Sequence, residues 1–186
     1  MTSSSLVSSP AMSLPEIEFR VARSDDAAGF AVFAERVFRA AFGSYNTVAD
    51  MDSYCAGAFG VARQRAEIAD PARHTELVFA DGELAAYFQL RSEPPPAFVT
   101  GAAPIEILRF YVDPRWHGRG VAQAMMDHVI ALARGRGAGA LYLSVWDRND
   151  RAIAFYARYG FAQVGNKQFL LGTDLQVDNV MTRAIS

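Results

Sequence analysis

A glycine-containing turn between a predicted strand and a predicted helix is the part of the sequence best suited to bind a ligand. The apolar run Ile105–Val112 precedes the turn, and an amphipathic stretch begins after it at Val121. A helix that begins at such a turn aims backbone N–H groups and the positive end of its dipole at one point, which suits a diphosphate. Gly118 and Gly120 have no Cβ, so phosphates can approach the backbone closely. These features predict a diphosphate site at the turn.

The spacing of the glycines excludes the two common phosphate-binding motifs. A Walker A loop needs a Gly-Lys pair, and the one lysine of the chain, Lys167, lies far from the turn. A dinucleotide-binding fingerprint needs Gly or Ala where Gln123 stands. The pattern that remains is Arg-x-x-Gly-x-Gly, in which Arg115 and Arg119 add positive charge.

This pattern resembles the coenzyme A signature of the GCN5-related N-acetyltransferases. A second segment agrees with the spacing and order of that family's next motif. Its motif residues are Asn149, Ala152, Tyr156, Gly160 and Phe161. The resemblance covers about residues 25–184 and implies an enzyme that uses acetyl-CoA as co-substrate and no metal.

The resemblance also implies where the coenzyme lies. In the family, the fourth strand parts from the fifth, and the pantetheine arm inserts between them. Pro114 supports such a gap because proline cannot donate a hydrogen bond to a neighbouring strand, so we expect pairing to fail near it. The residues that we assign to the coenzyme are Phe110, Tyr111, Val112, Arg115, His117, Gly118, Arg119, Gly120, Val121, Ala122, Asn149 and Arg158.

Tyr156 is the candidate general acid that protonates the leaving thiolate, a role that the resemblance implies. On a helix it shares a face with Asn149, because the two are seven residues apart. The alternative is that Tyr156 is one more aromatic residue of the core. Asn149 has the alternative of capping its helix, and Arg158 that of an exposed surface side chain.

Glu106 is the candidate base, acting directly or through water. A carboxylate on a mostly apolar strand is costly unless it is paired or functional. Strict alternation along the strand places Glu106 on the face of Leu108 and Phe110 and places Arg109 on the other face. Arg109 is therefore not expected to be its structural partner.

The C-terminal segment resembles the PaiA-like subgroup, which acetylates polyamines and related amines. The matching residues are Phe169, Gly172, Asp178 and Met181. This implies direct transfer of the acetyl group from acetyl-CoA to a primary amine of a small molecule, with a polyamine-like acceptor favoured. The alternatives are a protein or peptide N-acetyltransferase and a non-catalytic acyl-CoA-binding regulator.

Two further features concern the acceptor, and neither decides between a small molecule and a peptide. The proline-rich segment 92–104 either obstructs or shapes an acceptor groove. Asp50 and Asp52 either hold an amine or belong to a solvated helix face.

Composition bounds the class of protein. The chain has 186 residues, 51% of them hydrophobic and 20% charged, which fits one folded domain with a core. A formal net charge of −2 speaks against nucleic-acid binding. One cysteine and three separated histidines predict no metal site, and the sequence has no run of 18 apolar residues for a membrane span. We expect a cytoplasmic protein, either a monomer or a homodimer.

The remaining elements must position this chemistry. Strands are expected at 16–22, 105–112, 140–146, 161–165 and 178–185, with a hairpin at 75–90, and helices at 25–42, 121–134 and 149–159, with a breakable helical region at 48–69. This order predicts one α/β (α+β) domain at 16–186 after a disordered tail at 1–15. Its sheet is mixed, mostly antiparallel and splayed between strands 4 and 5, with helices on both faces.

Overall fold

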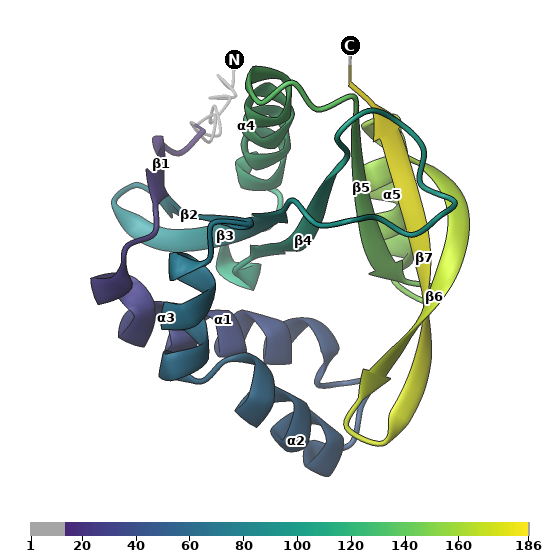
Figure 1. The fold of residues 1–186 in the computed structure, drawn as a ribbon. Coiled ribbons are helices and arrows are strands. Elements are labelled where there is room, and N and C mark those ends of the chain that lie inside the picture. The colour runs from purple at the N-terminus through teal and green to yellow at the C-terminus, as the bar shows by residue number, and fades with distance from the viewer. Residues whose placement is uncertain (1–13, 186) are drawn as a thin grey trace, which may run out of the picture.

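The computed structural model describes residues 14–185, which form a seven-stranded sheet with helices on both faces (Figure 1). The strands are β1 (Ile17–Val21), β2 (Arg73–Ala80), β3 (Glu83–Arg91), β4 (Ile105–Val112), β5 (Ala140–Trp146), β6 (Ala162–Leu171) and β7 (Asp174–Ala184). The helices are α1 (Ala27–Phe42), α2 (Val48–Ala58), α3 (Val61–Ala69), α4 (Val121–Gly135) and α5 (Asp150–Arg158). Of the predicted tail at 1–15, all but Leu14 and Pro15 lies outside the described residues.

The order of the strands is β1-β2-β3-β4-β5-β7-β6. Among the described strands, β4 and β5 are the one parallel pair, and the other neighbours are antiparallel. The mixed, mostly antiparallel sheet that we predict is therefore confirmed.

Elements with strong local signals lie where the sequence predicts them. The bounds of β4 and β5 agree with the predicted ones. Asp81 and Gly82 have φ values of 49° and 80°, the left-handed conformation that a tight hairpin turn requires. The C-terminal hairpin is longer than predicted, because β6 has 10 residues and β7 has 11. Most side chains of β6 are exposed, so no continuous apolar run marks its length.

Each face of the sheet carries its own apolar core. On one face, α4 buries Val121, Met125 and Val129 in a cluster that also includes Tyr156. On the other face, Phe30 of α1 packs its ring edge against Tyr87 of β3, with 4.8 Å between centroids. In Figure 1, α1, α2 and α3 lie below the sheet, and α4 lies above it.

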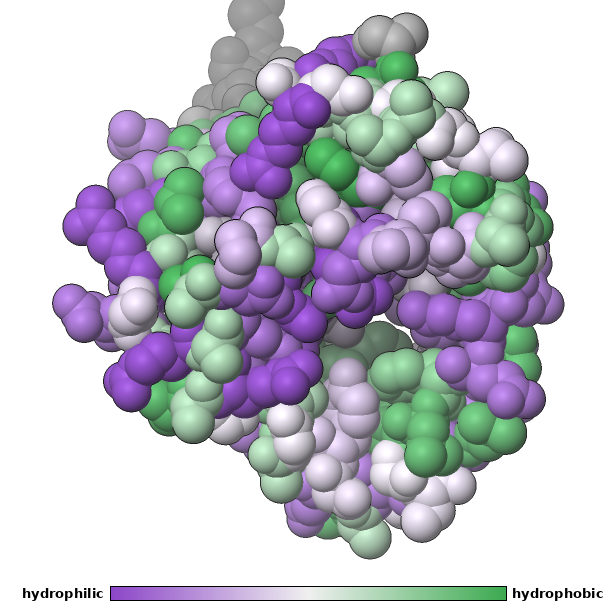
Figure 2. Space-filling view, viewed as in Figure 1, coloured by the Kyte–Doolittle hydropathy of each residue, from purple (hydrophilic) through white to green (hydrophobic). Residues whose placement is uncertain are grey.

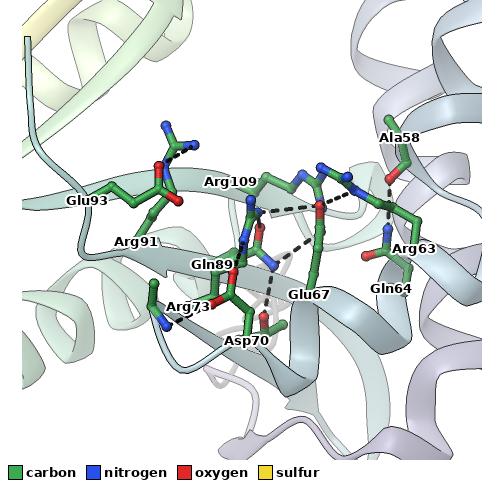
Figure 3. A network of polar contacts seen from close by, with 12 residues as sticks. Ala58, Arg63, Gln64, Glu67, Asp70, Arg73, Gln89, Arg91, Glu93 and Arg109 are labelled. Carbon is green, nitrogen blue, oxygen red and sulfur yellow. Dashed lines mark hydrogen bonds and ion pairs between the residues drawn. The ribbon is translucent and has the colours of Figure 1, made fainter.

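A network of charged side chains joins α3 to the sheet (Figure 3). The carboxylate of Glu67 is 3% exposed and accepts hydrogen bonds from Arg109 at 2.6 Å and Arg63 at 2.7 Å. Arg73 lies 3.4 Å from the same carboxylate. Because a buried charge is tolerated only when it is paired, this network holds Arg109 of β4 in one position.

The sheet parts between β4 and β5, as predicted, but at a different place. Residues Ile105–Ile107 pair with Leu141–Leu143, and pairing stops there. Beyond that point β5 remains paired along its whole length with β7. An irregularity opposite Gln89 and Leu90 leaves Leu108 as an extra residue of β4. The gap therefore begins at a bulge, well before Pro114, and the expectation that the proline causes it is wrong.

Candidate active site

A cleft of about 1030 Å³ runs from the parted strands to the glycine-containing turn. Its walls come from α1, β4, the end of β5, α5 and the β6–β7 hairpin. The face drawn in Figure 2 is hollowed near its middle, where β4 and β5 part above α1 (Figures 1 and 2). The cleft brings residues from both halves of the chain to one place.

The backbone of β4 presents free hydrogen-bonding groups to this cleft. The N–H of Asp113 donates to the carbonyl of Ala85 on β3 at 2.8 Å. Because the backbone groups of neighbouring residues in a strand point to opposite sides, those of Phe110 and Val112 point away from β3, into the gap. Pairing with β5 ends at Ile107, so the sheet supplies no partner for them.

His117 lies at the mouth of the gap. Its Nε2 is 3.0 Å from the carbonyl oxygen of Val112, and its Nδ1 is 3.0 Å from Nη1 of Arg151. Because arginine only donates, Nδ1 must accept and Nε2–H must donate, which assigns the neutral imidazole. The Val112 carbonyl is thus occupied by His117, which leaves the Val112 N–H and both groups of Phe110.

The turn before α4 has the geometry of an anion site. Gly118 and Gly120 have φ values of 73° and 84°, a left-handed conformation that side chains strain. No side chain caps the first turn of α4, so its N–H groups are available to a ligand. A Cβ at Gly118 would meet no atom within 4 Å, whereas one at Gly120 would meet the side chain of Leu14 at 3.0 Å.

The structure brings together ten of the predicted site residues. The predicted residues that line the cleft are Glu106, Phe110, Tyr111, Val112, His117, Gly118, Ala122, Asn149, Tyr156 and Arg158. The other four lie outside its lining. Arg115 donates to Asp113 at 3.0 Å, Arg119 lies over the Trp116 ring, Gly120 faces Leu14, and Val121 is buried in the core.

Tyr156 has the properties of a proton donor. Its ring packs against Phe110, Phe155 and Phe161, with centroids 5.5–6.1 Å apart. Within residues 14–185, no hydrogen bond engages its hydroxyl, although the side chain lines the cleft. Burial raises the pKa of Tyr156 well above its ordinary value, so the phenol stays protonated at neutral pH.

Asn149 acts as the N-cap of α5, because its side chain accepts a hydrogen bond from the N–H of Ala152 at 3.2 Å. The capping alternative is thereby confirmed, and the side chain also lines the cleft. The cap fixes the start of the helix that carries Tyr156.

Glu106 has a structural partner that the sequence did not indicate. Its carboxylate is buried and accepts a hydrogen bond from Nε of Arg91 at 2.7 Å. Glu106 lies opposite Arg91 of β3, whereas Phe110 lies opposite Phe88 of β3. Because Arg91 and Phe88 are three residues apart, Glu106 and Phe110 face opposite sides of the sheet. The expectation that they share a face is wrong, because the bulge at Leu108 interrupts the alternation.

The half of the cleft between α1 and the β6–β7 hairpin is largely aromatic, and most of its aromatic residues were not predicted. Its aromatic residues are Phe38, Phe42, Tyr45, Tyr54, Phe59, Trp146 and Phe169. They come from α1, α2 and distant strands, and no spacing in the sequence connects them. Asp50 and Asp52 are not in the lining, because Asp50 binds Thr173 and Asp52 pairs with Arg39. Their structural alternative is therefore the one observed.

Comparison with known proteins identifies the family. Residues 34–161 match the sequence profile of the acetyltransferase (GNAT) family. This chain belongs to that family. An uncharacterized N-acetyltransferase of Mycobacterium tuberculosis (strain ATCC 25618 / H37Rv) is 34% identical over 125 residues, which are 67% of this chain and 75% of that protein. Another, from Lactobacillus delbrueckii subsp. lactis, is 26% identical over 156 residues, 84% and 90% of the two chains.

Solved structures agree on the fold of this acetyltransferase. The PaiA N-acetyltransferase of Thermoplasma acidophilum, solved in complex with coenzyme A, has a TM-score of 0.74 at 17% identity and covers 91% of this chain and 99% of its own. The protein is an acetyl-CoA-dependent N-acetyltransferase. The uncapped helix, the paired left-handed glycines and the free groups of Phe110 suit the diphosphate and pantetheine of that co-substrate.

Among residues 14–185, no helix is both long and apolar enough to cross a membrane. In the same range, no three His, Cys, Asp or Glu side chains cluster as metal ligands would.

Asp113 links the end of β4 to the turn, and its substitution is expected to weaken the fold in a pH-dependent way. Its carboxylate is 1% exposed and accepts from Arg36 at 2.6 Å and from the N–H of Arg115 at 3.0 Å. Burial opposes ionisation of Asp113, but these hydrogen bonds outweigh it and hold its pKa well below the ordinary value. Asp113→Asn should lower the free energy of unfolding by about 1–3 kcal/mol at pH 7.

The sign of the pH effect follows from the lowered pKa of Asp113. The stabilisation is complete above the unfolded pKa of about 3.9 and is lost as pH falls below it. Urea unfolding of parent and variant should therefore differ most at pH 7 and somewhat less at pH 3, because the loss is complete only below the lowered pKa of the folded state. A difference that is the same at both pH values would contradict the ion-pair account.

Proposed function

We propose that this acetyltransferase acetylates a primary amine of a small molecule by direct attack in the gap between β4 and β5, with Tyr156 as the general acid. The observation that carries the proposal is the protonated, unengaged hydroxyl of Tyr156 beside the free backbone groups of Phe110. The co-substrate supplies an acetyl group activated as a thioester.

Residues of this chain bind the co-substrate, polarise its acetyl group and protonate the leaving sulfur. The N–H groups of Phe110 and Val112 hold the arm of the co-substrate and polarise the acetyl oxygen. Tyr156 gives its proton to the departing sulfur and regains one from water. His117, Gly118, Ala122, Asn149 and Arg158 bind the co-substrate from the turn and from α5.

Glu106 is the proposed site for the attacking amine. Its carboxylate lines the cleft beside Arg91, and its oxygens can accept a hydrogen bond from an ammonium group. The amine then loses its proton to Glu106 directly or through water. The new C–N bond forms as the C–S bond breaks, the second proton of the amine leaves to water, and the products are an amide and a free thiol.

The loop Ser92–Pro104 supports a small acceptor over a peptide. It crosses the face of β5, β6 and β7 in Figure 1. The ring of Phe98 lies so close to Gly165 that a Cβ there would be 2.8 Å from it. Val99 packs with Tyr142 and Val180. A polypeptide laid along this face would have to displace the loop.

The test is thiol release from acetyl-CoA with a panel of acceptors. The panel holds aliphatic diamines, amino acids and a peptide with a free N-terminus. We expect thiol release with an aliphatic amine, and a product heavier by one acetyl group. Coenzyme binding without transfer to any amine would favour a regulator, and transfer to the peptide alone would favour a protein acetyltransferase.

A further inference from the structure

Asp178 is a buried carboxylate in the cleft to which the proposed mechanism gives no role. It is 8% exposed and lines the cleft from β7. Within residues 14–185, no hydrogen bond or ion pair engages its carboxylate. The other acids in the lining differ, because Glu106 is paired with Arg91 and Asp150 is exposed at the start of α5.

The sheet register places Asp178 beside an aromatic side chain and the only lysine. Its direct cross-strand partners are Trp146 of β5 and Lys167 of β6, so the three side chains share one face. The Trp146 ring packs against Tyr45, with centroids 5.1 Å apart. Lys167 lies 3.9 Å from Glu106, and its ammonium is therefore drawn toward that carboxylate.

Burying a carboxylate without a partner is energetically unfavourable, so the position of Asp178 calls for an explanation. Burial raises the pKa of Asp178 above its ordinary value, with the charge of Lys167 opposing the effect. Replacing a carboxylate that has a structural role removes hydrogen bonds, whereas replacing Asp178 would remove none within residues 14–185. A ligand that brings a positive charge would compensate the burial.

We propose that Asp178 binds a cationic group of the acceptor, separate from the amine that is acetylated. This inference rests on the proposed function. Only β5 separates β7 from the gap, and neighbouring strands lie about 4.8 Å apart. An acceptor whose reactive amine lies in the gap therefore reaches Asp178 through a short chain, which passes the aromatic ring of Trp146.

The chemical class that fits this arrangement is a short aliphatic amine with a second positive charge. The carboxylate supplies the counter-charge, and the aromatic wall covers the methylene groups and attracts the cation. A second group that is neutral leaves Asp178 uncompensated, and one that is negative is repelled. Asp178 therefore selects the acceptor by the charge of the group at its far end, in addition to the requirement for a reactive amine.

The test compares three ligands that differ only at that far end: 1,4-diaminobutane, 4-aminobutan-1-ol and 4-aminobutanoate. Each is titrated calorimetrically into the parent and into Asp178→Asn, with both proteins saturated with coenzyme A. The parent should bind the diamine at least about tenfold more tightly than the amino alcohol. Asp178→Asn should lose this preference. The same preference in parent and variant, or none in the parent, would overturn the proposal.

Two controls separate this result from other causes. Asp147→Asn removes an exposed carboxylate whose charge also acts on Asp178 but which does not line the cleft, and it should keep the preference. Asp178→Asn should unfold at the parent's temperature or above, and a lower temperature would reveal a structural carboxylate and overturn the proposal. If the parent bound 4-aminobutanoate more tightly than the diamine, Lys167 rather than Asp178 would select the acceptor, and the proposal would be overturned.

Binding and catalysis are read separately in this design. Absence of acetyl transfer to any amine would contradict the proposed function while the binding preference still decides the role of Asp178. Where transfer occurs, Asp178→Asn should raise KM for the diamine and leave kcat within about twofold.

Discussion

Replacing Tyr156 by Phe is expected to lower kcat by about 10²–10³-fold while the affinity for coenzyme A stays unchanged. The substitution removes one hydroxyl and keeps the ring that packs against Phe110 and Phe161. Because no hydrogen bond engages this hydroxyl within residues 14–185, the fold should not weaken. The measurements are steady-state acetyl transfer, coenzyme titration and thermal unfolding.

Tyr159→Phe is the matched control. Tyr159 lies on the same helical segment, and its hydroxyl donates to the backbone carbonyl of Gln123 at 3.2 Å. It does not line the cleft, so its loss should change kcat by less than about threefold. Equal effects of the two substitutions, or an unaltered kcat for Tyr156→Phe, would contradict the role of Tyr156 as the acid.

Replacing Glu67 by Gln is expected to lower the free energy of unfolding by about 3–5 kcal/mol. Burial raises the pKa of this carboxyl, but Arg109, Arg63 and Arg73 outweigh the effect and hold the pKa below its ordinary value. The amide would leave Arg109, whose side chain is 12% exposed, without its counter-charge, whereas Arg73 would keep its ion pair with Asp70. Removing one partner of a buried ion pair therefore costs far more than the pair itself contributes.

Urea unfolding at pH 7 measures the effect of Glu67→Gln. Glu35→Gln is the matched control, because Glu35 pairs with Arg39 on the surface, where the two side chains are 39% and 36% exposed. Its loss should cost less than about 1 kcal/mol. A cost for Glu67→Gln as small as that of the control would show that the network in Figure 3 contributes little.

The parts of the site that the sequence predicted depend on local signals. The bounds of β4, the left-handed glycines and the helix that begins at Val121 all follow from residues within one short segment. The role of Tyr156 was implied by the family resemblance, and helical spacing placed it on one face with Asn149 and Ala152, because all three lie in or next to one short helix. In these segments local conformation and tertiary packing favour the same structure.

The parts that were missed depend on how distant strands pair. The bulge at Leu108 arises from the register between β3 and β4, and it reverses the face of every residue on one side of it. For that reason Glu106 meets Arg91, a residue 15 positions away on another strand. The aromatic wall of the cleft likewise combines α1, β5 and the β6–β7 hairpin, which no local pattern relates.

Amide hydrogen exchange along β4, with and without coenzyme A, tests the parted sheet most directly. The N–H groups of Phe110 and Val112 should exchange rapidly in the free protein and slow markedly when coenzyme A binds. Those of Arg109 and Tyr111 point to β3 and should be protected in both states, which supplies an internal control. Protection of Phe110 and Val112 in the free protein, or binding of coenzyme A without any change in their exchange, would contradict insertion of the co-substrate between β4 and β5.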